Sequence, residues 1–285
     1  MRPGPTLSLL LALAVPAACG GSSVEPQTAT ALDVDLPGVD TSQFTPREKH
    51  EFSRYVRELA APCTKVAVPI ATCVIEHRAC DTCIPAAEAI AKAVREGMSS
   101  EQVQQLYKDR FDEASARAIP LEGSPSRGPL TAPVVLVEFA DFECPFCQRI
   151  APAMDELWDK RKDKVRFVYK FMPLPMHPHS EIAARAAIAA AAQGKFWEMD
   201  KKLFAAGQRL ERSDLEGYAS ALGLDLEKFR ADMDSPETQA RLDADKKLAD
   251  QLDVHGTPTI FVDGHLFDTK ADLGAWLDQE IAAHR

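Results

Sequence analysis

The chain has 285 residues, of which 46% are hydrophobic and 27% charged, and its formal net charge is -10. This length suffices for one large domain or two ordinary ones with an apolar core, which excludes a chain that is disordered throughout. The acidic balance argues against nucleic acid as a partner, because phosphate would be repelled. The only long apolar stretch, residues 7–15, is too short to span a bilayer.

The N-terminal residues have the layout of an export signal. A basic residue precedes the apolar stretch, and two small residues stand directly before Cys19. The placement of Cys19 resembles a bacterial lipobox, although Pro16 stands where that motif usually has leucine. We expect a signal peptide over residues 1–18 and lipidation of Cys19; a plain secretory signal is the alternative. In either case the mature protein is expected outside the cytosol, in the bacterial cell envelope, where disulfides persist.

A flexible linker and a small helical domain are expected next. Residues 19–43 are rich in Gly, Ser, Pro and Thr and lack basic residues, which is typical of an unpacked tether. Residues 44–118 are predicted to form a small all-α domain. Its first helix begins with the capping box of Thr45 and Glu48. The others are expected over about 66–77, from about 85 to 97, and from a cap at Ser99 with Gln102.

A proline- and glycine-rich linker over residues 119–132 precedes a domain of another kind. Its predicted elements are buried strands at 134–139 and 166–171, a helical insertion at about 172–254, a hairpin at 259–267, and a last helix at about 271–284. This order predicts an α/β domain over residues 133–285.

The sequence Cys144-Pro145-Phe146-Cys147 follows the first strand directly and opens a helix. Two thiols at this spacing can close a reversible disulfide, and a helix N-terminus stabilises a thiolate on the first of them. We therefore expect Cys144 to be the exposed nucleophile and the more buried Cys147 to resolve the mixed disulfide. A zinc site would need two more ligands, haem attachment would need histidine where Gln148 stands, and an inert disulfide is the remaining alternative.

Residues 128–285 resemble the DsbA-like members of the thioredoxin superfamily. The resemblance is carried by the segments GPLTAPVVLVEF (128–139), DFECPFC (141–147), QGKFW (193–197) and HGTPT (255–259). It implies a thioredoxin-like fold with a helical insertion, here preceded by the small all-α domain.

The resemblance assigns a substrate groove. Pro258 matches the family's cis-proline, which faces the two cysteines and lines the groove for the partner. Thr257 would offer its backbone to an extended substrate strand. Phe146 and His255 are further candidates for substrate binding.

The resemblance also places a buried acid beneath the cysteines at Glu138. A carboxyl there would have a raised pKa and accept the proton of Cys147. The alternative is that Glu138 faces solvent at a sheet edge. Lys170 on the next strand is a candidate ion-pair partner for Glu138. His177 and His179 are interpreted as a polar connection, so we expect no metal and no cofactor.

Cys63, Cys73, Cys80 and Cys83 lie in the predicted helical domain, where two disulfides are expected to act as structural staples. Three connectivities are open. Residues 78–111 resemble the helical thiol domain of the cytochrome c maturation protein CcmH, through RACDTC, EGMS, Tyr107 and Arg110-Phe111. This resemblance implies a second redox pair, Cys80 and Cys83, as the alternative.

The predicted function is that of an extracytoplasmic thiol–disulfide oxidoreductase, tethered to the membrane only by lipid. Its expected partners are exported cysteine-containing proteins and a membrane protein that recycles the pair. A helix N-terminus favours a disulfide donor. Three features oppose this direction. Phe146 lacks the hydrogen-bond donor that a histidine would provide, and Glu143 repels a thiolate on Cys144. A threonine before the cis-proline, here Thr257, resembles the isomerase and reductase branches of the family. A reductase or isomerase, for example in cytochrome c maturation, and a non-catalytic peptide-binding adaptor remain the alternatives.

Overall fold

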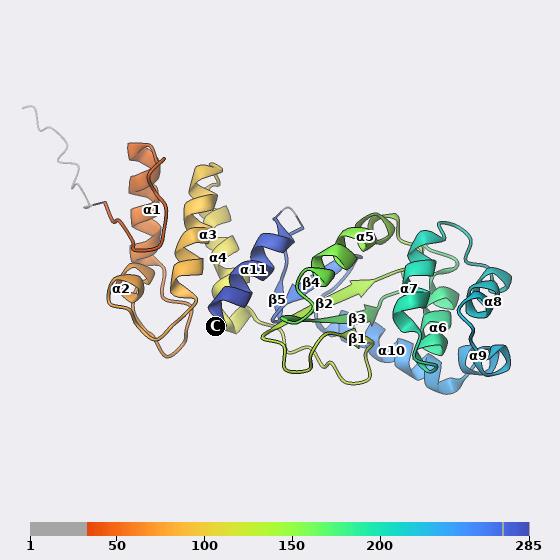
Figure 1. Ribbon diagram of the computed structural model, residues 1–285. Helices are drawn as coiled ribbons and strands as arrows, with labels where there is room; N and C mark the ends of the chain where they lie inside the picture. The colour runs from red at the N-terminus through yellow and green to blue at the C-terminus, as the bar shows by residue number, and fades with distance from the viewer. Residues whose placement is uncertain (1–32, 270, 285) are drawn as a thin grey trace, which may run out of the picture. The chain divides into compact units, whose positions relative to one another are not determined.

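The computed structural model describes residues 33–269 and 271–284 (Figure 1). The predicted signal peptide, Cys19 and the first part of the predicted linker lie outside these residues. Among the described helices, none combines the length and the apolar character needed to cross a membrane.

Four α-helices form the N-terminal helical region: α1 (Pro46–Glu58), α2 (Ile70–Ile75), α3 (Cys83–Arg95) and α4 (Ser100–Phe111). The capping boxes predicted at the starts of α1 and α4 are both present. Helix α2 begins later than the sequence predicts, because the chain before it forms bends and a turn and Pro69 pairs with Ala60 as an isolated bridge. A short 3-10 turn, η1 (Glu113–Ser115), follows α4.

The end of the predicted linker is packed, contrary to expectation. Val34, Leu36 and Val39 are buried in the core of the helical region, and the backbone N–H of Val34 donates to Ser53 Oγ at 2.8 Å. The expectation of an unpacked tether is therefore wrong for these residues. Their apolar side chains are spaced irregularly among acidic residues, so no helical or strand period marked them as core.

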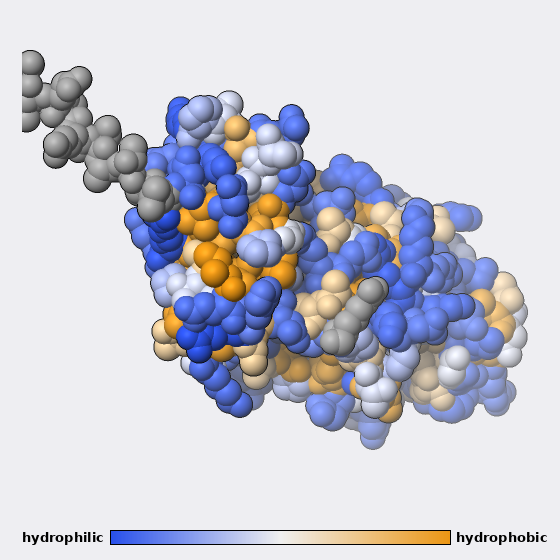
Figure 2. All heavy atoms as spheres, turned by 60° about the vertical axis from the view of Figure 1, so that its left-hand side comes forward, coloured by the Kyte–Doolittle hydropathy of each residue, from blue (hydrophilic) through white to orange (hydrophobic). Residues whose placement is uncertain are grey.

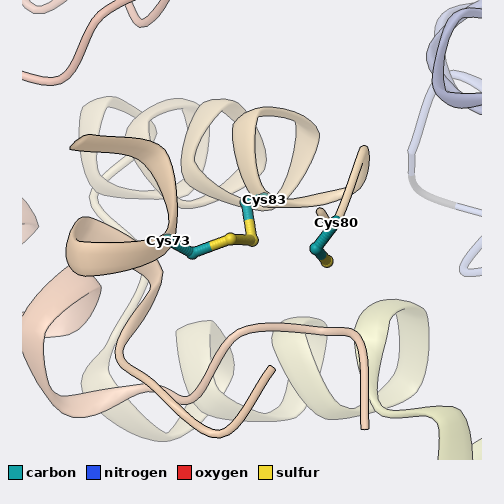
Figure 3. A group of neighbouring side chains, drawn as sticks. All are labelled: Cys73, Cys80 and Cys83. Carbon is teal, nitrogen blue, oxygen red and sulfur yellow. A yellow bond between two sulfur atoms is a disulfide. The ribbon is translucent and has the colours of Figure 1, made fainter. Parts of the chain in front are cut away.

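The four cysteines of this region form two disulfides, Cys63–Cys80 and Cys73–Cys83. Figure 3 shows the bond between Cys73 and Cys83 with Cys80 beside it, and the sulfur atoms of these three residues lie within 4.8 Å of one another. Cys80 and Cys83 are not joined to each other, so the structure does not form the CxxC disulfide of the alternative interpretation.

Hydrophobic residues also reach the surface of the helical region (Figure 2), where Ile75 and Ile84 are exposed.

A five-stranded mixed sheet, with strand order β1-β3-β2-β4-β5, follows. Its strands are β1 (Ser126–Arg127), β2 (Val134–Ala140), β3 (Val165–Phe171), β4 (Thr259–Val262) and β5 (His265–Leu266). The central strand β2 runs parallel to β3 and antiparallel to β4. Strand β1 was not predicted: it lies within the expected linker and is only two residues long.

Seven further helices lie in the part of the chain that the structure describes. They are α5 (Pro145–Asp159), α6 (Ser180–Ala191), α7 (Phe196–Ala205), α8 (Arg212–Ala221), α9 (Leu226–Met233), α10 (Pro236–Gln251) and α11 (Leu273–Ala283). Helices α6 to α10 form the predicted insertion between β3 and β4 (Figure 1). The alanines of α6 are buried in the same core as Cys144 and Cys147, which lets neighbouring elements approach closely.

A buried ion pair corrects the partner expected for Lys170. The ammonium of Lys170 lies 3.3 Å from Asp245 of α10, not beside Glu138, and the two side chains are 2% and 1% exposed. Asp245 also accepts from Arg241 at 2.8 Å and from the backbone N–H of Phe171 at 3.0 Å. Successive side chains of a strand point to opposite faces, and β3 directs Lys170 toward α10.

Replacing Asp245 by alanine is expected to lower the free energy of unfolding by about 3–5 kcal/mol, because it leaves the Lys170 ammonium buried without a counter-charge. Urea unfolding measures the change. Asp243→Ala on the exposed side of the same helix is the matched control, expected within about 0.5 kcal/mol of wild type. Equal losses in the two variants would contradict the role given to this ion pair.

Candidate active site

Cys144 and Cys147 lie at the start of α5, four residues beyond the end of β2. Cys144 is the N-cap of the helix and Pro145 its first residue, a position where no backbone donor is needed. Both cysteines are free thiols, and both are buried. The expectation of an exposed Cys144 is therefore wrong: 3% of the residue is accessible. The thiol of Cys144 donates a hydrogen bond to the carbonyl oxygen of Thr257, with 3.4 Å between sulfur and oxygen.

The peptide bond between Thr257 and Pro258 is cis. Strand β4 follows directly and pairs with β2, with Thr259 opposite Phe139, which sets this loop beside the start of α5. Phe146 is 55% exposed next to the cysteines, and the guanidinium of Arg149 lies 4.9 Å from the centre of its ring. His255 points into solvent, with a side chain 77% exposed and a hydrogen bond of 2.7 Å to Asp253.

Two carboxylates in the loop before Cys144 are held by two histidines that follow β3. Asp141 accepts from the backbone N–H groups of Glu143 and Leu174, both at 2.8 Å, and lies 2.7 Å from His177 Nδ1. Glu143 accepts from the backbone N–H of His179 at 2.6 Å and lies 3.1 Å from its Nδ1. This hydrogen bond to Glu143 raises the pKa of His179.

These contacts change the role expected for Glu143. Its carboxylate is buried and is held by the backbone N–H and the imidazole of His179. No local pattern predicts this pairing, since the partners are 36 residues apart. It arises because β2 and β3 are parallel neighbours, and the loops that leave their carboxyl ends meet at one edge of the sheet.

The start of α5 gives the two thiols different environments. Backbone N–H groups in the first turn of a helix have no partner within the helix, and Cys144 stands beside them as the N-cap, although its side chain makes no capping hydrogen bond. Cys147 lies one turn further in; burial, and to a smaller degree the charge of Glu138, raise the pKa of its thiol. Gln148 anchors the turn by donating to the carbonyls of Phe142 and Gly207.

Glu138 is a buried carboxyl, 4% exposed, on the central strand β2. Burial raises its pKa to about 8, although the nearby guanidinium of Arg127 acts in the opposite direction. A pKa of about 8 favours the protonated form of this carboxyl at neutral pH.

Arg127 is a buried neighbour of Glu138 that the sequence did not reveal. The short strand β1 carries it into the core, where its guanidinium lies between the rings of Trp158 and Trp197, at 4.4 and 4.2 Å. It pairs with Asp155 of α5 at 2.6 Å. A lone arginine in a proline- and glycine-rich segment has no period to mark it as buried.

A mixed sheet, a CxxC motif at the N-terminus of the helix after its central strand, and a cis-proline loop facing that motif define a thioredoxin-type redox domain. Within the described residues, neither Cys144 nor Cys147 belongs to a group of three potential metal ligands.

The sequence profile of the thioredoxin family matches residues 120–279, more than half of the chain. A thioredoxin-like oxidoreductase from Silicibacter pomeroyi has a similar structure, with a TM-score of 0.51 and 31% identity over 55% of this chain and 90% of that one. Oxidised BdbD from Bacillus subtilis shares the fold, with a TM-score of 0.53 and 22% identity over 58% of this chain and 97% of that one. The chain therefore belongs to the thioredoxin family.

One curated relative is a much longer protein. The protein called Na(+)/H(+) antiporter NhaA 1 of Mycolicibacterium gilvum is 42% identical over 163 residues, which are 56% of this chain and 26% of that protein. The chain thus spans about a quarter of the length of that relative.

Proposed function

We propose that this chain is an exported disulfide donor that oxidises cysteine-containing proteins of the cell envelope through Cys144 and Cys147. The observation that carries the proposal is the position of Cys144 at the N-cap of α5, with its Sγ atom 3.4 Å from the carbonyl of Thr257 in the cis-proline loop. An extended substrate that hydrogen-bonds to this loop brings its own sulfur to the sulfur of Cys144.

The reaction begins with the oxidised pair. A thiolate of the substrate attacks Cys144 Sγ, the Cys144–Cys147 bond breaks, and Cys147 leaves as a thiolate that takes a proton from Glu138. A second substrate thiolate then attacks the substrate sulfur of the mixed disulfide. The substrate disulfide forms and Cys144 leaves as a thiolate, so two electrons pass from the substrate to the pair.

The proposed direction of electron flow depends on how well a thiolate on Cys144 is stabilised. The N-terminus of α5 stabilises a negative charge on Cys144, which favours the reduced pair and makes its disulfide oxidising. The hydrogen bonds that His179 makes to Glu143 weaken one of the three features that oppose this direction. Thr257, the residue before the cis-proline, has an uncharged side chain and adds no charge that would oppose a thiolate on Cys144.

The proposed location is the outer side of a bacterial membrane, to which a lipid on Cys19 would tether the chain after removal of residues 1–18. The two disulfides of the helical region support an oxidising compartment. The proposed partners are exported proteins with free thiols and a membrane oxidase that returns the pair to the disulfide form. Phe146 and the backbone of Thr257 are the proposed substrate contacts; His255 points into solvent at the edge of this region.

Oxidation of a client tests this function. The mature chain with its Cys144–Cys147 disulfide formed is mixed with an equal amount of a reduced, unfolded peptide that carries two cysteines, and free thiols are counted by alkylation and mass spectrometry. We expect the peptide to lose two thiols while Cys144 and Cys147 gain them, with both disulfides of the helical region unchanged. A peptide that stays reduced while the pair stays oxidised would exclude the donor function.

A further inference from the structure

One buried carboxyl near the cysteines has no part in the chemistry described so far. Asp200 lies on α7, in the helical insertion, and is 6% exposed. Its Oδ1 atom has no hydrogen-bond partner among the described residues. A buried carboxylate without partners is costly to the folded state, so such a group needs an explanation.

Asp200 faces the same cavity as Glu138. The cavity has a volume of about 10 Å³ and lies between the sheet, α5 and α7. The hydroxyl of Tyr169 also lines it and is buried without a partner among the described side chains. A space of this size holds about one water molecule, and the three polar groups supply the partners that a buried water requires.

Asp200 also lines a second pocket of about 190 Å³, beside α5 and α7, to which Gln148, Asp155 and Lys201 contribute. Lys201 is 57% exposed, so this pocket lies next to solvent. Asp155 faces both spaces too, but its carboxylate is held between Arg127 at 2.6 Å and Lys201 at 3.4 Å. Asp200 is thus the carboxyl that lies between Glu138 and the surface without a fixed counter-ion.

We propose that Asp200 is a relay residue that passes the proton between Glu138 and solvent, through the cavity on one side and the pocket beside Lys201 on the other. This inference rests on the proposed function, in which Glu138 exchanges a proton with Cys147. When Cys147 leaves as a thiolate, Glu138 protonates it, Asp200 returns a proton to Glu138, and solvent in the pocket reprotonates Asp200. When the pair is reoxidised, one proton moves outward along the same groups.

The charges around Asp200 support a protonated relay. Burial, and next the charge of Glu138, raise the pKa of Asp200 well above its ordinary value, with a further contribution from Asp155. Arg127 and Lys201 act in the opposite direction and are outweighed. A raised pKa favours the protonated form of Asp200, from which it is able to donate to Glu138 when Glu138 ionises.

Asp200→Asn keeps the shape of the side chain and removes its exchangeable acid. We expect the rate at which dithiothreitol reduces the Cys144–Cys147 disulfide to fall about tenfold or more, with an increased solvent deuterium isotope effect. Formate, which is small enough for the pocket, is expected to restore part of this rate. The matched control is Glu198→Gln on the same helix, whose carboxylate pairs with Lys195 at the surface and is expected to leave the rate unchanged.

The outcomes separate the two proposals. A wild-type chain that does not exchange disulfides would overturn the proposed function itself. A wild-type chain that exchanges them, with Asp200→Asn equal to Glu198→Gln in rate, isotope effect and response to formate, would overturn the relay alone.

Infrared spectroscopy keeps the test decisive should Asp200→Asn fail to fold. The wild-type chain at neutral pH is expected to show two buried protonated carboxyl bands, of which one persists in Glu138→Gln. A single band in the wild type, absent from Glu138→Gln, would also overturn the relay.

Discussion

Cys144→Ser is expected to abolish disulfide exchange, whereas Cys147→Ser is expected to stop the reaction at the mixed disulfide. A serine hydroxyl is not ionised at neutral pH and forms no disulfide, so the first variant has no group that substrate sulfur can join. In the second variant Cys144 is still able to attack a substrate disulfide, but no neighbouring thiol releases the product. Non-reducing gels and mass spectrometry of each variant, incubated with a client that carries a disulfide, measure the covalent complex.

The two variants serve as controls for each other, because they change neighbouring positions of the same turn. We expect a covalent complex with Cys147→Ser and none with Cys144→Ser. Complexes formed equally through Cys147 in the Cys144→Ser variant would contradict the assignment of Cys144 as the attacking thiol. Exchange that persists in both variants would place the redox site at the cysteines of the helical region.

Glu138→Gln is expected to slow exchange about a hundredfold at pH 7, because the acid that protonates Cys147 is removed. The wild-type rate is expected to change with pH around the Glu138 pKa of about 8, and the variant is expected to lack this titration. Glu156→Gln is the matched control on α5, since its exposed carboxylate pairs only with Lys160 at the surface. A Glu138→Gln variant with the rate and pH profile of Glu156→Gln would contradict a role of Glu138 in proton transfer.

The same variant is expected to change the pH dependence of stability. The pKa of Glu138 rises from an ordinary 4.5 to about 8 on folding, so between these values the folded chain keeps a proton that the unfolded chain releases. Wild-type stability therefore falls as the pH rises through this window. Glutamine does not titrate, so Glu138→Gln is expected to gain about 3–5 kcal/mol relative to wild type between pH 4.5 and pH 8.5. Urea unfolding at these two pH values measures the difference.

The elements that carry the chemistry could be predicted from sequence because their signals are local. Strand β2, the CxxC motif and the start of α5 follow one another within fifteen residues, and the capping boxes of α1 and α4 are four-residue patterns. Resemblance to the DsbA-like proteins added Glu138 and Pro258. Glu138 is buried, and the bond before Pro258 is cis, although their roles stay predictions.

What the sequence did not predict depends on contacts between distant segments. His179 reaches Glu143, Lys170 reaches Asp245, and Arg127 enters the core on a strand of two residues. The hydrogen bond from the thiol of Cys144 to the carbonyl oxygen of Thr257 likewise links residues that are 113 positions apart. No spacing rule within one helix or strand encodes such pairs, because they are created by strand order and by the packing of the insertion.

The reduction potential of the Cys144–Cys147 pair, measured in the mature chain by equilibration with glutathione, decides whether the pair is a disulfide donor. A disulfide donor requires a value above about -150 mV, and this is the result we predict. A value below about -230 mV would make the pair an electron donor and reverse the proposed direction. A pair that does not titrate with glutathione at all would contradict the assignment of the site as redox-active.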